Sequence, residues 1–406
     1  MGKRAYLLGP VLALAMLPSN VVAAAMPLLL SEWGVTNAEG GIVFAAYQVG
    51  YVLSVLVLLP LTDRVRTGRV IALCALATAL SFLLFPFFAF NVWSASLLRF
   101  CAGLGLAGIY MPGVRIIAAA AEPARRGLAV GAYVAAFYLG SSASLWAAGV
   151  LLPGFGWRGA ALILGAASFM ALPLSIISTR KLSAPAGGQA HLDLSVLRDP
   201  PIARNILAYT RHSWELYVSR GWLAAFVAGT LIARGIDKTG AASDGSQWAA
   251  LMSAFGTVGV FAGGWLSDRL GRARAALVMT FLSGALSLLF GFLGAGPLAL
   301  LVFVGCAYYV LISADSAIYS TSITELAPPA RLGSAQGLQA FFGFGATILS
   351  PIAAGKVLDL QWGWGAVFVL AGSVGMLLAL PLLFGLRSAR PEWLTQSTQR
   401  SQRKTP

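Results

Sequence analysis

Apolar runs dominate the chain, and short stretches of Gly, Pro, Asn and charged residues separate them. A membrane-spanning helix needs roughly 20 mostly apolar residues. Twelve runs fit that description, at 6–30, 38–61, 70–90, 93–119, 128–151, 158–178, 207–233, 245–267, 273–293, 297–322, 333–355 and 364–386. They are too uniformly apolar for barrel strands, and hydrocarbon offers backbone amides no other partner, so we expect helices throughout.

The first run has a second interpretation. Lys3 and Arg4 lie near its start, and an apolar stretch follows that ends in Val22-Ala23-Ala24-Ala25. A cleavable signal peptide has the same pattern. The run is long enough to span a membrane, and its removal would break the repeat described next. We therefore take it as the first span.

Short motifs recur about half a chain apart. The repeated motifs are Asp63-Arg64-Val65 with Asp268-Arg269-Leu270, and Pro123-Ala124-Arg125 with Pro329-Ala330-Arg331. A nearly constant offset is typical of transporters built from two parallel repeats. We therefore expect an all-α membrane protein with 12 transmembrane helices in two pseudo-symmetric six-helix bundles. The expected parts are a first bundle (1–178), a cytoplasmic linker (179–206), a second bundle (207–387) and a cytoplasmic tail (388–406).

The linker carries Leu192, Leu194 and Leu197 among polar residues. These leucines can line a short amphipathic helix on the membrane surface, and a plain tether fits the segment equally well. The tail is rich in Ser, Gln, Arg and Lys, which predicts a disordered segment.

Charge is scarce and basic: 10% of residues are charged, with 28 Lys+Arg against 14 Asp+Glu. A soluble domain carries roughly a quarter charged residues, which argues against a water-soluble enzyme. The basic residues form no continuous face, so we expect no nucleic-acid partner. With both termini in the cytoplasm, only Arg158, Arg234, Lys238 and Lys356 among the loop cations fall outside. That asymmetry predicts cytoplasmic termini and a location in the plasma membrane, the inner membrane of a bacterium.

The sequence shows no pattern typical of a catalytic or metal-binding site. The three cysteines lie inside apolar runs, and two histidines cannot build a metal site alone. The sequence has no phosphate-binding Gly-x-x-x-x-Gly-Lys-Ser/Thr loop and no spaced nucleophile and base. We expect no cofactor, no bound metal and no enzymatic activity.

The most specific motif is Gly264-Trp265-Leu266-Ser267-Asp268-Arg269-Leu270-Gly271-Arg272-Ala273-Arg274. It resembles the Gly-x-x-x-Asp-Arg-x-Gly-Arg-x-Arg loop that the major facilitator superfamily carries between the second and third helices of a repeat. The first-half copy, residues 59–70, has Leu59 in place of the first Gly. The resemblance covers nearly the whole chain and implies a secondary transporter whose two halves rock about a central site.

A cytoplasmic gate is expected around these loops, formed by Asp63, Arg64, Arg115, Asp268, Arg269 and Arg272. A carboxylate at a helix end can meet an arginine and the positive helix terminus of the opposite half, a contact worth about 0.5–2 kcal/mol. We expect Arg115 to pair with Asp63. A topology signal with lipid contact alone is the other interpretation.

Ionisable groups inside spans are costly and point to function. On the predicted seventh helix, His212, Glu215 and Arg220 share one broad face, which either lines the transport path or forms a fixed Arg211–Glu215 pair. The tenth helix carries Asp315. We expect His212, Glu215 and Asp315 to couple transport to protons.

Substrate-binding candidates are polar residues of the predicted spans: Asn20, Tyr47, Gln48, Arg99, Tyr110, Arg220, Tyr309 and Asp315. Several of them also fit a packing role. Arginines outnumber acids within the spans, which favours a small polar solute, an organic or inorganic anion, moved together with protons. The alternatives are efflux of an amphiphilic or toxic compound, suggested by the many aromatic residues, and a sensor without transport. The expected partners are a small-molecule substrate, a coupling ion (H⁺) and the lipid bilayer, with the chain as a monomer.

Overall fold

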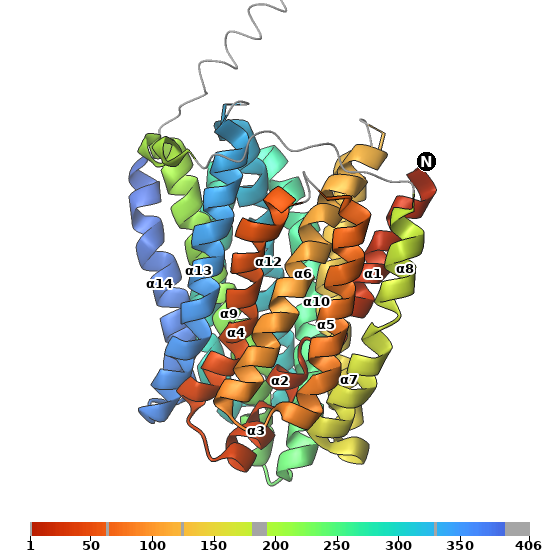
Figure 1. Cartoon of the computed structure of the whole chain (residues 1–406). Coiled ribbons are helices and arrows are strands. Elements are labelled where there is room, and N and C mark those ends of the chain that lie inside the picture. The colour runs from red at the N-terminus through yellow and green to blue at the C-terminus, as the bar shows by residue number, and fades with distance from the viewer. Residues whose placement is uncertain (1, 62–64, 123–125, 181–192, 329–330, 386–406) are drawn as a thin grey trace, which may run out of the picture.

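The computed structural model describes residues 2–61, 65–122, 126–180, 193–328 and 331–385. Within these ranges the chain is helical, without a β-strand, as the sequence predicts. The long helices run side by side from one end of the molecule to the other (Figure 1).

The first half begins with a broken span, followed by longer helices. Its elements are η1 (Gly2–Leu7), α1 (Leu8–Met16), α2 (Val21–Ala24), α3 (Met26–Trp33), α4 (Asn37–Leu61), α5 (Thr67–Phe88), α6 (Val92–Ala120), α7 (Arg126–Ser168) and α8 (Ala171–Thr179). The short η3 (Leu194–Arg198) precedes the second half. The remaining elements are α9 (Pro200–Ile232), α10 (Lys238–Leu270), α11 (Arg272–Phe290), η4 (Gly291–Ala295), α12 (Leu298–Leu326), α13 (Leu332–Asp359) and α14 (Gly363–Gly385).

These elements account for the twelve predicted spans and for two six-helix halves. Eight described stretches are long and apolar enough to cross a membrane by length and composition, and one of them, Ala129–Thr179, contains two predicted spans. The first run is divided among short helices, Gly363–Leu377 is a shorter apolar helix, and α9 carries many polar residues. The fold class is therefore confirmed for the described residues, whereas the side of the membrane on which the termini lie stays a prediction.

Two breaks in helical geometry shape the first half. The first span breaks between α1 and α2, where Pro18 lies and Asn20 leaves the helical region (φ −101°, ψ 9°). The fifth and sixth spans meet inside α7 at Gly156, whose φ of 61° and ψ of −179° belong to a region that only glycine adopts readily. Glycine therefore makes the turn between these two spans possible.

The linker is shorter than its predicted bounds. Helix α9 begins at Pro200 rather than at residue 207, because Asp199 accepts a hydrogen bond from the Ile202 amide at 3.5 Å and proline suits a first helical turn. Before it, η3 buries Val196 against Ile202 and Ile206. The linker helix thus packs on the second half through Val196 and the partly buried Leu197, while Leu194 is exposed.

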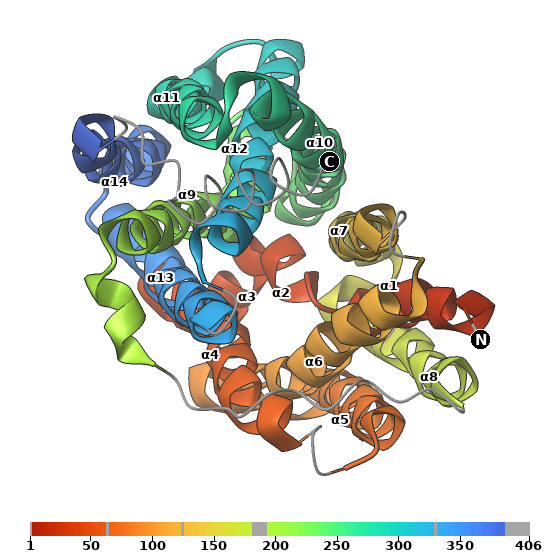
Figure 2. The ribbon, with the colours of Figure 1, turned by 90° about the horizontal axis from the view of Figure 1, so that it is seen from above.

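We call the end of the molecule that holds η3 and the start of α9 the linker end, and the opposite end the α3 end (Figure 1). Seen along the helices, α4 faces α13 and α7 faces α10 where the two halves meet (Figure 2). The halves are joined by hydrogen bonds at the α3 end. Asp359 of α13 accepts the Asn37 and Ala38 amides at 2.8 and 2.9 Å, at the first turn of α4.

Candidate functional site

A cavity of about 410 Å³ lies between the two halves. The first half lines it with Tyr47, Gln48 and Tyr51 of α4, Leu106 and Tyr110 of α6, and Val130, Gly131, Val134, Phe137 and Tyr138 of α7. The second half lines it with Tyr209, His212, Ser213, Leu216, Tyr217 and Arg220 of α9, Val260 of α10, Ser316, Ala317, Ser320 and Thr321 of α12, and Phe344 and Thr347 of α13. Aromatic and hydroxyl side chains thus form most of its wall.

The two walls differ in charge. Among the described lining residues, the first half contributes no ionisable group other than tyrosine, and the second half contributes Arg220 and His212. The described wall carries no carboxylate. A cavity with this lining favours an anion over a cation.

Arg220 is enclosed by aromatic rings. Its guanidinium centre lies 5.1 Å from the ring centroid of Tyr138 and 5.5 Å from those of Phe137 and Tyr217. None of the ion pairs in the described part of the chain includes Arg220. Ring faces stabilise a guanidinium without neutralising it, so its charge remains available to a ligand.

The α4 wall presents buried polar groups to the cavity. The buried Tyr47 hydroxyl has no hydrogen-bond partner in the described residues, and Gln48 is only 6% exposed. Such groups are costly to bury unless something pairs with them. On α6, Tyr110 stacks on Tyr133 with ring centroids 5.7 Å apart, which fixes its ring beside the cavity.

A charged cluster is buried in the second half, next to the cavity. Asp315 of α12 lies between two α9 residues: its Oδ1 is 2.6 Å from His212 Nδ1, and its Oδ2 is 3.4 Å from Arg211 Nη2. Arg211 also donates to the hydroxyl groups of Tyr319 and Thr280. These side chains are almost completely shielded, and only His212 of the two partners reaches the cavity wall.

Glu215 lies one helical turn beyond Arg211 and is 1% exposed. Its Oε2 accepts a hydrogen bond from Ser283 of α11 at 3.3 Å, and its Oε1 has no partner in the described residues. A buried acid with this limited support is costly to keep ionised. The cluster therefore holds two carboxylates close to a single arginine.

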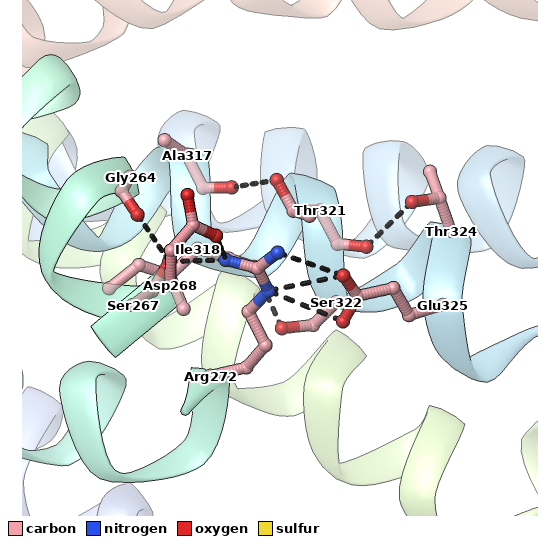
Figure 3. Close-up of polar contacts among 10 residues, drawn as sticks. All are labelled: Gly264, Ser267, Asp268, Arg272, Ala317, Ile318, Thr321, Ser322, Thr324 and Glu325. Carbon is pink, nitrogen blue, oxygen red and sulfur yellow. Dashed lines mark hydrogen bonds and ion pairs between the residues drawn. The ribbon is translucent and has the colours of Figure 1, made fainter. Parts of the chain in front are cut away.

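A second polar network closes the linker end of α10, α11 and α12 (Figure 3). Arg272 donates to Asp268 Oδ1 at 2.5 Å and to Ser267 Oγ at 2.6 Å. Its other side donates to Glu325, with an Nη2–Oε1 distance of 2.9 Å. Arg272 thus ties three helix ends of the second half together.

The sequence matches a known family over almost its whole length. The model of the Major Facilitator Superfamily matches residues 8–237 and 231–406. This chain belongs to the major facilitator superfamily. Its fold agrees: a bacterial homolog of the human lysosomal transporter Spinster, in an inward-facing and occupied conformation, superposes with a TM-score of 0.76 at 16% identity, over 95% of this chain and 96% of that one.

Two curated relatives in the superfamily span most of the chain. A gallate transporter of Pseudomonas putida is 24% identical over 396 residues, covering 88% of this chain and 85% of that protein. A gentisate transporter of Corynebacterium glutamicum is 26% identical over 391 residues, covering 91% of this chain and 84% of that protein. The chain is therefore a member of a transporter superfamily, and its membrane location agrees with its apolar helices.

In this superfamily member, five predicted site residues line the cavity: Tyr47, Gln48, Tyr110, His212 and Arg220. Asp315 and Glu215, predicted for coupling, lie behind that wall with His212 between Asp315 and the cavity.

Three other candidates lie outside the lining of this cavity, and their contact with substrate stays a prediction. Asn20 donates to the Ser141 carbonyl at 2.8 Å. Arg99 donates to the Ser19 carbonyl at 2.5 Å and stacks on Tyr47. Tyr309 accepts from Ser219 at 3.0 Å. Each has a hydrogen-bond partner within the protein, which sequence position alone did not reveal, although the buried Nε of Arg99 has none in the described residues.

The gate prediction meets the structure only in part. Asp63 and Arg64 lie outside the described residues, so the predicted pairing of Arg115 with Asp63 stays a prediction. Arg269 lies with its guanidinium centre 4.1 Å from the Trp265 ring centroid. Asp268 bonds to Arg272 of its own half, and within the described residues its ion pair is with that half alone, so the contact with the opposite half stays a prediction.

Besides Tyr47 and Tyr110, the wall contains aromatic residues that the sequence did not single out. Phe137, Tyr138, Tyr209 and Tyr217 surround the cavity, and three of them approach Arg220. A signal for the two tyrosines on α9 was present in the sequence. The lining residues of α9 follow one another at steps of one and three residues, so they share one face of the helix. They are Tyr209, His212, Ser213, Leu216, Tyr217 and Arg220.

Proposed function

We propose that the protein is a secondary active transporter of a small organic acid, with an aromatic carboxylate as its preferred substrate. The observation that carries the proposal is Arg220: a cation in the central cavity, surrounded by rings and without a carboxylate partner in the described residues. A substrate carboxylate supplies that partner, and the rings of Phe137 and Tyr138 supply a surface for an aromatic body.

The size of the cavity supports a small solute. About 410 Å³ is near the lower end of the range of ligand pockets, roughly 300–1,000 Å³. The relatives described as transporters of gallate and gentisate support the same class, since both compounds are aromatic carboxylates. The uncharged α4 and α7 wall has hydroxyl and amide groups for ring substituents. Efflux of amphiphilic cations is disfavoured, because the wall carries cations and no described carboxylate.

Proton coupling belongs to the same proposal. His212 lies at the cavity wall and within 2.6 Å of Asp315, so a proton taken up from the cavity reaches a buried acid in one step. An imidazole has two ring nitrogens, so it can accept a proton on one side and donate one on the other. In this proposal the two halves rock about the cavity, both termini face the cytoplasm, and the chain works as a monomer in the plasma membrane.

Proteoliposome uptake tests the substrate. Purified protein is expected to take up radiolabelled gentisate, with competition by gallate and benzoate and none by the cation tetraphenylphosphonium. Arg220→Gln removes a charge-assisted hydrogen bond, worth about 1.5–3 kcal/mol, and should weaken apparent affinity roughly 10- to 100-fold. Arg220→Lys should retain part of it, and Arg198→Gln in η3 is the matched control. Equal affinity in the wild type and Arg220→Gln would remove Arg220 from substrate binding.

Coupling is tested separately from binding. In Asp315→Asn and Glu215→Gln, accumulation driven by a pH gradient should fall, while counterflow exchange of gentisate continues. Full accumulation by both variants would exclude these acids from the coupling mechanism. If the wild type neither accumulates nor exchanges any aromatic acid, a sensor would be favoured over a carrier.

A further inference from the structure

The buried cluster of the second half has an unequal charge inventory. Its described members are the carboxylates of Asp315 and Glu215, the guanidinium of Arg211 and the imidazole of His212. If both acids are ionised, Arg211 balances only one of them, and a proton on His212 or on a carboxylate must balance the other. A cluster this deeply buried tolerates little net charge.

Arg211 lies between the two acids. Its Nη2 faces Asp315 at 3.4 Å and also donates to Tyr319 and Thr280. Its Nε and Nη1 have no hydrogen-bond partner in the described residues, and neither does Glu215 Oε1. The arginine therefore has unused donors on one side and a nearby carboxylate with an unused acceptor.

The side chains of Arg211 and Glu215 converge on Gly375 of α14. A Cβ built on this glycine would lie 3.3 Å from Glu215 Oε2 and 3.7 Å from Arg211 Nη1. Arg211 and Glu215 are also four residues apart on α9, the spacing at which arginine and glutamate pair along a helix. This spacing places the Arg211 guanidinium and the Glu215 carboxylate on the same face of α9.

The groups that face the two acids can be named by element. Helix α9 contributes Arg211, His212 and Glu215, and α12 contributes Asp315 with the hydroxyls of Tyr308 and Tyr319. Helix α11 contributes only the hydroxyls of Thr280 and Ser283, and α14 the glycine. Among these described groups, His212 alone lies at the cavity wall.

We infer that Arg211 is a positioning residue that serves the two carboxylates in turn. It holds Asp315 while that acid is ionised, and it passes to Glu215 when a proton reaches Asp315 through His212. The exchange changes which of α12 and α9 the guanidinium binds, and so links proton entry to the packing of these helices. The inference rests on the proposed proton-coupled function.

The sharing of Arg211 between Asp315 and Glu215 can be tested without substrate, by neutralising these charges one at a time and in pairs. Arg211→Gln leaves two buried acids with His212 and should lower the melting temperature of purified protein by several degrees. The double variants Arg211→Gln/Asp315→Asn and Arg211→Gln/Glu215→Gln each leave one acid with His212, and both should recover most of that loss. Recovery with Asp315→Asn alone would mean that Arg211 serves only the acid it touches, and would overturn the inference.

Transport separates positioning from a static structural role. In proteoliposomes, both double variants should exchange [¹⁴C]gentisate and yet lose its accumulation under a pH gradient at least tenfold, whereas Arg211→Lys should keep part of it. Double variants that accumulate like the wild type would assign Arg211 to stability alone and overturn the inference. If the wild type transports no aromatic acid while both double variants recover their melting temperature, the substrate assignment fails and the shared counter-charge stands.

Discussion

Two arginines within the spans illustrate how environment decides the role of a residue. Arg220 lies in the cavity among rings, without an ion pair in the described residues. Arg99 is 2% exposed and donates to the carbonyl of Ser19, at the break in the first span. That break leaves the Ser19 carbonyl without a helical partner among the described backbone bonds. Arg99 therefore stabilises the broken span, a role that composition could not distinguish from anion binding.

Substitution of these arginines should separate stability from binding. Arg99→Gln should destabilise the protein by about 1–3 kcal/mol, because a buried carbonyl loses its donor. Arg220→Gln should change the melting temperature little and affinity strongly. Thermal unfolding and gentisate uptake of both variants check this prediction. A stable Arg99→Gln with reduced affinity would return Arg99 to the substrate site.

At the scale of elements, hydrophobic patterning was enough to predict twelve spans, and recurring motifs were enough to predict their grouping into two repeats. Their interruptions depend on backbone features that patterning does not report. The first span breaks near Pro18, α9 starts early at its Asp199 cap, and α7 turns at Gly156. The site was predicted in part for the same reason: spacing indicates which residues share a face, such as His212 and Arg220. It does not indicate which faces meet across the halves, as Tyr138 and Arg220 do.

The turn at Gly156 provides a test with a matched control. Alanine at this position must adopt φ near 61° and ψ near −179°, at a cost of about 1–3 kcal/mol. A methyl group added at Gly154 would have no neighbouring atom within 4 Å, and Gly154 has no positive φ, so Gly154→Ala should be neutral. Chemical unfolding of both variants in detergent measures the difference. Equal stability of the two variants would show that the turn does not require glycine.

At the scale of the whole molecule, the halves are joined at the α3 end by a carboxylate. Asp359 accepts two backbone amides of α4 and the Asn37 side chain, at 2.8–2.9 Å. A carboxylate at a helix N-terminus meets unpaired amides and the positive end of the helix dipole. This contact favours the conformation in which the α3 end is closed, and any rocking that opens this end must break it.

Loss of this contact should shift the balance between conformations. In Asp359→Ala, a larger fraction of molecules should show a long distance between spin labels at Thr36 and Trp362. The reason is that the conformation with a closed α3 end loses about 0.5–2 kcal/mol of stabilisation. Asp359→Asn keeps one acceptor and should give an intermediate shift. Pulsed electron spin resonance on protein with the native cysteines replaced measures the distribution. An unchanged distribution in Asp359→Ala would mean that the contact does not bias the two states.

The unequal walls of the cavity have a consequence for redesign. The charged groups described at the cavity belong to the second copy of the repeat, whereas the first copy lines it with aromatic, aliphatic and amide side chains. We therefore expect the first copy to determine which solute shapes fit and the second copy to bind the solute's charge. Substitution of the aromatic residues on α7, or of Gln48 on α4, should therefore change which solutes bind and leave in place the second-half residues that we propose for proton coupling. Libraries aimed at new cargo are best confined to the first copy.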